Sequence, residues 1–311
     1  MSKRVIGILA MAYGTPSSVE EIEPYYTHIR RGRKPESAQL QELTERYEAI
    51  GGLSPLNEIT AAQAAGLERT LNELDQDVQY RVYTGMKHAH PFIEETVQKM
   101  VEDGIEEAVG VVWAPHYSTM SIGTYIKSAE EAREKWGGPA RISYVESWHL
   151  QPLFVESTAA RVASALAQFP ADESASVPVV FTAHSLPERI MQLGDPYPEQ
   201  IEETGRAVTE QIGHHEWFTG WQSAGRTPEP WLGPDILDVI RTQHEQGVQA
   251  LVVCPVGFVS DHLEVQYDID IEAKQLADEL GMKLVRVASP NDEPLFLKAV
   301  ATAVLEQAKK G

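Results

Sequence analysis

The sequence of 311 residues contains a single cysteine, Cys254. A disulfide needs two thiols, and cysteine-ligated zinc or iron–sulfur sites need several, so neither can be built within this chain. Cys254 lies in the apolar run 250–256. This setting predicts a buried strand residue and not a reactive thiol.

Long apolar runs and positive charge are also scarce. No stretch approaches the ~20 apolar residues that a membrane-spanning helix needs. The 26 basic and 46 acidic residues give a net charge of −20, which disfavours nucleic-acid binding because phosphate contacts need a basic surface. Residues 1–12 have a basic start and a short apolar run, but a turn follows at once without a cleavage signal. We therefore expect a first buried strand, no stable membrane insertion and a cytoplasmic protein.

The sequence also lacks glycine-rich phosphate-binding motifs. Gly-x-Gly-x-x-Gly does not follow the first apolar run, and Gly-x-x-x-x-Gly-Lys-Ser/Thr does not occur. Both motifs place backbone amides around phosphates. Their absence argues against a dinucleotide- or ATP-dependent enzyme.

Short apolar runs alternate with longer amphipathic segments. Several runs carry β-branched residues at consecutive positions, which is typical of strands buried on both faces of a parallel sheet. The predicted strands are 5–12, 78–84, 108–114, 142–145, 177–182, 217–221, 249–256 and 283–288. The predicted helices are 37–50, 58–74, 91–101, 122–135, 153–169, 197–213, 235–246, 262–280 and 293–309, with a further helix opened by a Ser-x-x-Glu capping box at Ser17.

Regular alternation of strands and helices predicts the α/β class. We expect two similar doubly wound, Rossmann-like domains, each with a four-stranded parallel sheet flanked by helices, and a cleft between them. The proposed domains are residues 1–148 and 149–311. Whether the last helix packs back on the first domain is left open by the sequence.

Polar side chains gather directly after the predicted strands. In open α/β sheets, ligands bind beyond the carboxyl ends of the strands. The candidates there are Tyr13, Lys87, His88, His116, His184 and the segment 257–264. A strand-end tyrosine such as Tyr13 usually packs and hydrogen-bonds, although a tyrosine oxygen can also bind iron.

Acidic residues recur every fourth position at Glu264, Asp268 and Glu272. Like charges at this spacing cost a helix about 0.2–0.5 kcal/mol per pair. One interpretation is a solvated acidic face. The other is a carboxylate track that receives a divalent cation, and with His184 its nitrogen and oxygen donors suit iron(II), cobalt, nickel or zinc.

A basic run, Arg30 to Lys34, stands out in an acidic chain. Positive charge at a helix C-terminus is favourable in itself because of the helix dipole. The alternative interpretation is carboxylate recognition, for which the arginine fork is suited. Arg46, Tyr47 and Ser54 follow nearby and would suit an anionic ligand with several carboxylates.

Taken together, these motifs resemble the ferrochelatases, most closely the short soluble bacterial members that use coproporphyrin III. The resemblance runs through nearly the whole chain in family order, and its last three segments are the most specific. The matching segments are 12–16, 46–56, 115–118, 183–187, 221–223 (Trp-Gln-Ser), 230–234 (Pro-Trp-Leu-Gly-Pro) and 256–264 (Val-Gly-Phe-Val-Ser-Asp-His-Leu-Glu).

The resemblance implies a role for each matching residue. His184 and Glu264 take the places of the family's inner metal-site residues, and Tyr13 matches the axial ligand on the opposite face. Asp268 and Glu272 match an outer metal track. The positions implied to hold the porphyrin or border its cleft are Tyr13, Arg30, Arg46, Tyr47, Ser54, Lys87, His88 and Tyr125.

By this resemblance the protein is a coproporphyrin III ferrochelatase that inserts Fe²⁺ with release of two protons in haem biosynthesis. We expect coproporphyrin III and Fe²⁺ as substrates, no tightly bound cofactor, no iron–sulfur cluster, and a monomer with transient contacts to other haem-pathway enzymes. The alternatives are a protoporphyrin ferrochelatase, a cobalt chelatase of the same fold, and a non-catalytic haem or metal carrier.

Overall fold

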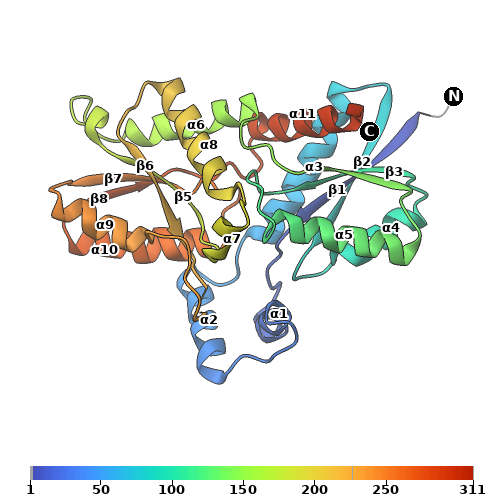
Figure 1. Cartoon of the computed structure of the whole chain (residues 1–311), viewed down its shortest axis with the longest axis horizontal. Helices are drawn as coiled ribbons and strands as arrows, with labels where there is room; N and C mark the ends of the chain where they lie inside the picture. The colour runs from blue at the N-terminus through green and yellow to red at the C-terminus, as the bar shows by residue number, and fades with distance from the viewer. Residues whose placement is uncertain (1–2, 226, 311) are drawn as a thin grey trace.

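The computed structural model describes residues 3–225 and 227–310 and contains two four-stranded parallel sheets side by side (Figure 1). The first has the order β2-β1-β3-β4 and the second the order β6-β5-β7-β8. The first sheet comprises β1 (Arg4–Ala12), β2 (Val78–Met86), β3 (Glu107–Val112) and β4 (Arg141–Val145). The second comprises β5 (Val179–His184), β6 (Trp217–Gln222), β7 (Ala250–Cys254) and β8 (Lys283–Arg286). The predicted α/β fold with two such sheets is confirmed.

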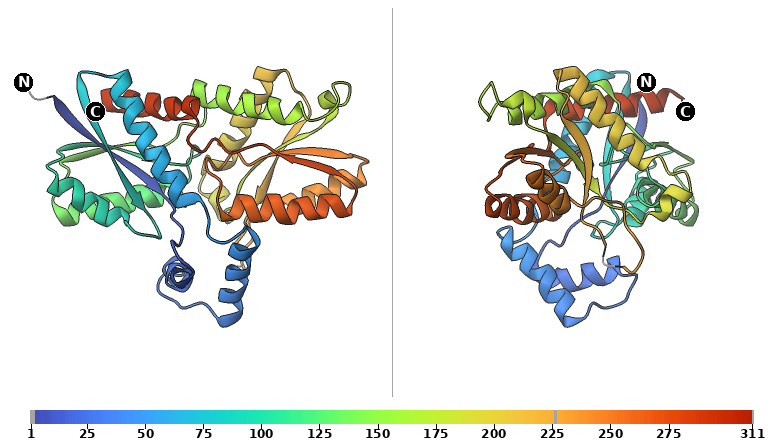
Figure 2. Two further views of the ribbon diagram at one scale, coloured as in Figure 1. Left: turned by 180° about the vertical axis from the view of Figure 1, so that it is seen from behind. Right: turned by 60° about the vertical axis from the view of Figure 1, so that its left-hand side comes forward.

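Helices cover both faces of each sheet (Figure 2), which explains why the central strands are apolar on both sides. In β1, Ile8 to Met11 are fully buried. The helices are α1 (Ile22–Ile29), α2 (Ser37–Ala49), α3 (Leu56–Leu74), α4 (Ile93–Glu102), α5 (Ile122–Trp136), α6 (Pro152–Leu166), α7 (Arg189–Gln192), α8 (Tyr197–Ile212), α9 (Ile236–Glu245), α10 (Lys274–Glu279) and α11 (Pro294–Lys310). No helix among these described residues is long and apolar enough to cross a membrane.

Two local predictions were wrong. The capping box at Ser17 does not form; the Ser17 amide instead donates to the carboxylate of Glu21, and a short 3₁₀ turn precedes α1. The predicted helix 262–280 is not a single α-helix. Its first part, Val265–Ala273, is a π-helix that continues into α10, and π-helical turns often mark functional sites.

The C-terminal helix α11 joins the two halves. It packs on α3 of the first half and on α6 of the second, and its Phe296 ring lies 6.2 Å from Trp113 and 5.9 Å from Trp148. At Gly66 of α3, an added Cβ would lie 2.4 Å from Leu297 Cδ1, so a larger residue there would force the Leu297 side chain to move. One apolar core therefore runs across residue 148, and a domain boundary there remains a prediction.

A second, polar junction joins the halves near the start of α8. The buried carboxylate of Asp195 accepts hydrogen bonds from the Ser118 and Thr119 hydroxyls and from the Thr119 amide. Tyr197 donates its own amide to the same carboxyl group. Because these bonds add to the α11 packing, the spacing of the two sheets is fixed at two places. By contrast, α1 and α2 project away from both sheets (Figures 1 and 2).

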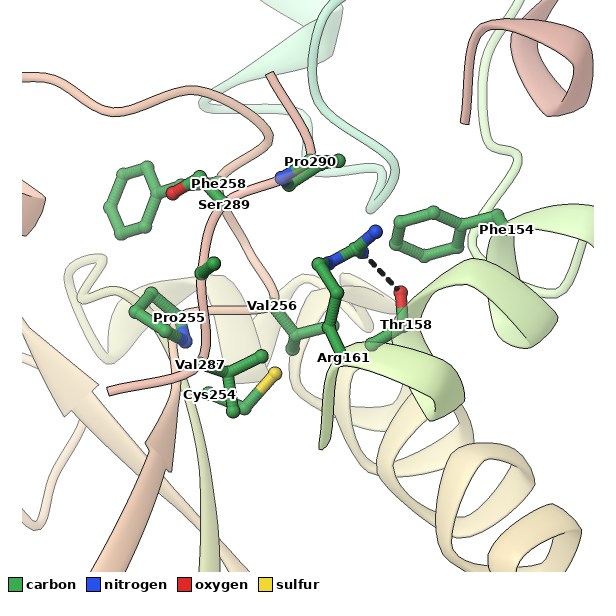
Figure 3. Close-up of a pocket in the computed structure, with 11 residues that line it drawn as sticks. Phe154, Thr158, Arg161, Cys254, Pro255, Val256, Phe258, Val287, Ser289 and Pro290 are labelled. Carbon is green, nitrogen blue, oxygen red and sulfur yellow. Dashed lines mark hydrogen bonds between the residues drawn. The ribbon is translucent and has the colours of Figure 1, made fainter. Parts of the chain in front are cut away.

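Cys254 is buried beside a pocket of about 10 Å³, which has room for one water molecule at most (Figure 3). The Arg161 guanidinium in this pocket is already bonded to Thr158, Ser157 and Glu293. Burial raises the pKa of the Cys254 thiol to about 12. The prediction of a buried, unreactive cysteine is confirmed.

Candidate active site

A cleft of about 1170 Å³ opens between the carboxyl ends of the two sheets. This volume exceeds the usual range for drug-sized ligands. Tyr13 follows β1 on one side and His184 ends β5 on the other, so the central strand of each sheet delivers a side chain to the cleft. We call the surface from the first half the first wall and the surface from the second half the second wall.

Three tyrosines lie on the first wall. Burial raises the pKa of Tyr13, and the nearby charge of Glu264 raises it further. Burial likewise raises the pKa of Tyr125. It also raises the pKa of Tyr47 to about 12, although the hydrogen bond with the Thr15 hydroxyl acts to lower it. These phenols are therefore neutral at neutral pH. The influence of Glu264 on Tyr13 also means that the two walls interact across the cleft.

Cations line the same wall. Arg46 of α2 reaches across to the second half, where its Nη1 lies 3.6 Å from Asp268 Oδ1 and its guanidinium lies 4.6 Å from the Tyr267 ring centroid. Lys87 donates to the Thr124 hydroxyl at 2.7 Å, and burial lowers its pKa to about 8, helped by Arg31. Arg30 also lines the cleft. The wall thus offers positive charge to an anionic ligand.

The second wall centres on His184 and Glu264. The Nδ1–H of His184 donates to the Ser185 carbonyl, so Nε2 faces Glu264 with a distance of 3.6 Å to Oε1. The other carboxylate oxygen, Oε2, lies 3.6 Å from Nε2 of His262. Both distances are longer than a good hydrogen bond. The carboxylate therefore stands between two imidazoles with space left around its oxygens.

Electrostatics couple this pair strongly. Burial disfavours the imidazolium of His184, but the negative charge of Glu264 and the hydrogen bond to the Ser185 carbonyl favour it and raise the pKa of His184 to about 9. Burial acts to raise the pKa of Glu264, but His184 and His262 outweigh burial and lower it. The pair is therefore an imidazolium and a carboxylate at neutral pH. The ordinary histidine pKa near neutrality does not hold here.

The carboxylate track follows the π-helix. Asp268 lines the cleft; burial, followed by the charge of Glu264, raises its pKa to about 6, although Ser223 donates a hydrogen bond to it. Ser223 holds a left-handed backbone with φ of 60°. Glu272 does not line the cleft but adds negative charge near Asp268. Because i→i+5 bonding widens the turns, residues four apart stay on one face.

The cleft brings together nearly all the residues that the sequence predicted. Glu272 lies outside its lining, and Asp261 is turned away, with its carboxylate bound by Arg286, Ser289 and Asn291. The predicted residues that line it include Tyr13, Arg30, Arg46, Tyr47, Ser54, Lys87, His88, His116, Tyr125, His184, Glu264 and Asp268. Their roles in binding and catalysis remain predictions.

Sequence reasoning assigned no role to several residues that support this site. Tyr197 donates its hydroxyl to the His184 carbonyl at 3.1 Å, and Ser223 holds Asp268. Gln222 donates to the Glu264 carbonyl at 3.3 Å while accepting from Thr182. Ser223 and Gln222 stand in the matching Trp-Gln-Ser segment, which was the one signal that could have identified them.

No group of three or more His, Cys, Asp or Glu side chains forms a ready-made metal site in the described part of the chain. The second wall offers the Glu264 carboxylate between the imidazoles of His184 and His262, all three lining the cleft.

Comparisons with known proteins identify the family of this chain. The family model described as "Ferrochelatase" matches residues 5–308. Coproporphyrin III ferrochelatases from Anoxybacillus flavithermus and Bacillus subtilis are each 51% identical to this chain, covering 100% and 99% of it and 98% and 99% of their own lengths. The sirohydrochlorin chelatase SirB from Bacillus subtilis, solved with cobalt, shares the fold with a TM-score of 0.60 and 14% identity over 99% of this chain and 96% of its own. The chain belongs to the ferrochelatase family.

Proposed function

We propose that this protein inserts Fe²⁺ into coproporphyrin III and releases two protons. The observation that carries the proposal is a single cleft in which the Tyr13 phenol occupies one wall and the His184–Glu264 pair the other. The curated relatives, which are about half identical over their full length, support the choice of porphyrin.

In this proposal the porphyrin lies against the first wall. Its propionates would bind Arg30, Arg46 and the Ser54 hydroxyl, because guanidinium groups grip carboxylates with two parallel hydrogen bonds. A planar ring hides its nitrogen lone pairs. Binding energy from the propionates can hold the ring in a bent conformation that exposes them.

The second wall would handle the cation and the protons. Fe²⁺ bound at Glu264 would offset the negative charge that holds the proton on His184, so the imidazolium would release that proton to water and its Nε2 lone pair would become free. His184 could then accept one pyrrole proton as general base and return to the imidazolium form. The second pyrrole proton would pass to water, which makes two protons released in all, and the four pyrrole nitrogens would bind the iron. Tyr13 would bind the inserted iron from the opposite face.

An anaerobic insertion assay tests this proposal. Fe²⁺ and Co²⁺ are each offered with coproporphyrin III, protoporphyrin IX and sirohydrochlorin, and the porphyrin absorption bands are followed. We expect the highest kcat/KM for Fe²⁺ with coproporphyrin III. A preference for sirohydrochlorin would identify a different chelatase, and tight binding of the metallated product without insertion would identify a carrier.

A further inference from the structure

Helix α3 of the first half contacts both the cleft and the loop that carries the second wall. Leu56 and Thr60 line the cleft, and Gln63 follows on the same helical face at the i, i+4, i+7 spacing. Gln63 is fully buried. Its side chain points not into its own half but into the segment 259–264 of the other half.

The Gln63 amide nitrogen donates to three oxygens of the second half. These are the Ser260 hydroxyl at 2.9 Å, the Asn291 carbonyl at 2.9 Å and the Val259 carbonyl at 3.2 Å. Its own Oε1 has no hydrogen-bond partner among the described residues. The reverse orientation of the amide would set Oε1 against the Val259 and Asn291 carbonyl oxygens, which cannot donate, so these two acceptors fix its direction.

Asn291 extends the same attachment. It holds a left-handed backbone with φ of 48°, and its side chain both accepts from the Asp261 amide at 2.8 Å and donates to the Asp261 carboxylate at 3.0 Å. Arg286 and Ser289 bind that carboxylate as well. The loop is thus held both by residues of the second half and by Gln63 of the first half.

A short chain of contacts leads from Gln63 to the reacting groups. Gln63 binds the Ser260 hydroxyl, and the Ser260 carbonyl accepts from His262 Nδ1 at 3.0 Å. This bond turns His262 Nε2 toward Glu264. The contact made by Gln63 joins this loop to the first half, which also forms the first wall.

We propose that Gln63 is a positioning residue that holds His262 and Glu264 at a set distance from the first wall, so that the metal reaches the centre of the bound porphyrin. The inference rests on the proposed function, since it assigns the metal step to the second wall. A fully buried amide that leaves its own acceptor unpaired costs stability, and correct placement of the loop gives a reason for its presence.

The Gln63→Met substitution tests this. Methionine has nearly the same volume and removes the unpaired oxygen together with the donors. The Val259 carbonyl keeps its bond from the Asn291 amide, but the Asn291 carbonyl loses a donor, so we expect a moderate loss of stability and a folded variant. We expect the Kd for Co²⁺, followed by its visible absorption bands, to rise about tenfold, and the KM for Fe²⁺ to rise similarly. The Kd for coproporphyrin III should stay within twofold of the parent value.

Leu67→Ala is the matched control, because Leu67 lies one turn further along α3 in the apolar core. It should lower the melting temperature more than Gln63→Met while leaving Co²⁺ binding unchanged. Parent-like Co²⁺ binding in folded Gln63→Met would overturn the inference. Should that variant not fold, Ser260→Ala removes one acceptor and should raise the Co²⁺ Kd about threefold; an unchanged Kd there would also overturn it. Absence of insertion by the parent protein would instead contradict the proposed function, and the Co²⁺ titration does not depend on it.

Discussion

The two walls of the cleft come from halves with the same topology but carry different chemistry. In each sheet a central strand, β1 or β5, delivers a side chain at its carboxyl end, Tyr13 in one case and His184 in the other. The first wall presents neutral phenols and cations, whereas the second presents an imidazolium–carboxylate pair and a further carboxylate. One architecture used twice thus carries two different sets of side chains, and in the proposed function one surface binds the ring while the other handles the cation and the protons.

The strongest test of this division is His184→Ala. We expect kcat for iron insertion to fall at least about 100-fold, because a general base and an inner ligand are lost together. The Kd for coproporphyrin III, measured by quenching of porphyrin fluorescence, should change less than twofold. His215→Ala, at an exposed position outside the cleft, is the control. Retained turnover in the His184 variant would show that the second wall does not carry the proton step.

Arg46→Leu tests the other wall. Loss of the guanidinium should raise the Kd for coproporphyrin III about tenfold, equivalent to ~1.4 kcal/mol, through loss of a propionate contact. Because Arg46 also lies against Asp268, Co²⁺ binding should stay equal or become tighter as the competing cation is removed. If the substitution weakened Co²⁺ binding as much as porphyrin binding, the two walls would not be separate in function.

The Glu264→Gln variant tests the ion pair on the second wall through the pH dependence of stability. The folded pKa of His184, about 9, lies above its ordinary 6.5, so its contribution to stability is complete below pH 6.5 and is lost as pH rises through 9. The lowered pKa of Glu264 adds stability above 4.5 that is lost in acid. Urea unfolding should therefore show the parent about 1 kcal/mol more stable than the variant near pH 6, after allowance for solvent screening of partly exposed groups, and nearly equal at pH 9.5. A pH-independent difference would contradict the ion pair.

Tyr13→Phe should have the smallest effect. The phenol is neutral at neutral pH and has no charge to attract Fe²⁺, so we expect kcat to fall only about threefold. The absorption spectrum of the bound iron product should change because an oxygen ligand is lost. Tyr25→Phe serves as the control, because the Tyr25 hydroxyl donates to the Gly14 carbonyl. This variant should leave that spectrum unchanged. An identical product spectrum in Tyr13→Phe would show that Tyr13 does not bind the iron.

Much of this arrangement was predictable from local patterns. Short apolar runs indicated all eight strands, and the rule that ligands bind beyond strand ends indicated Tyr13 and His184. The contact of Gln63 with Ser260 was not predictable, because the two residues are 197 positions apart and nothing local in the sequence links them. The π-helix was also missed, since its residues have ordinary helical spacing and only tertiary packing favours the wider turn.

The position of α11 has a consequence for how the protein is made. Residues 294–310 are translated after both sheets, yet they pack against α3 of the first half. Because synthesis proceeds at roughly 5–20 residues per second, the β1 sheet waits many seconds on the ribosome before α11 can cover it. Stalled or shortened chains would present this uncovered apolar face to chaperones and proteases.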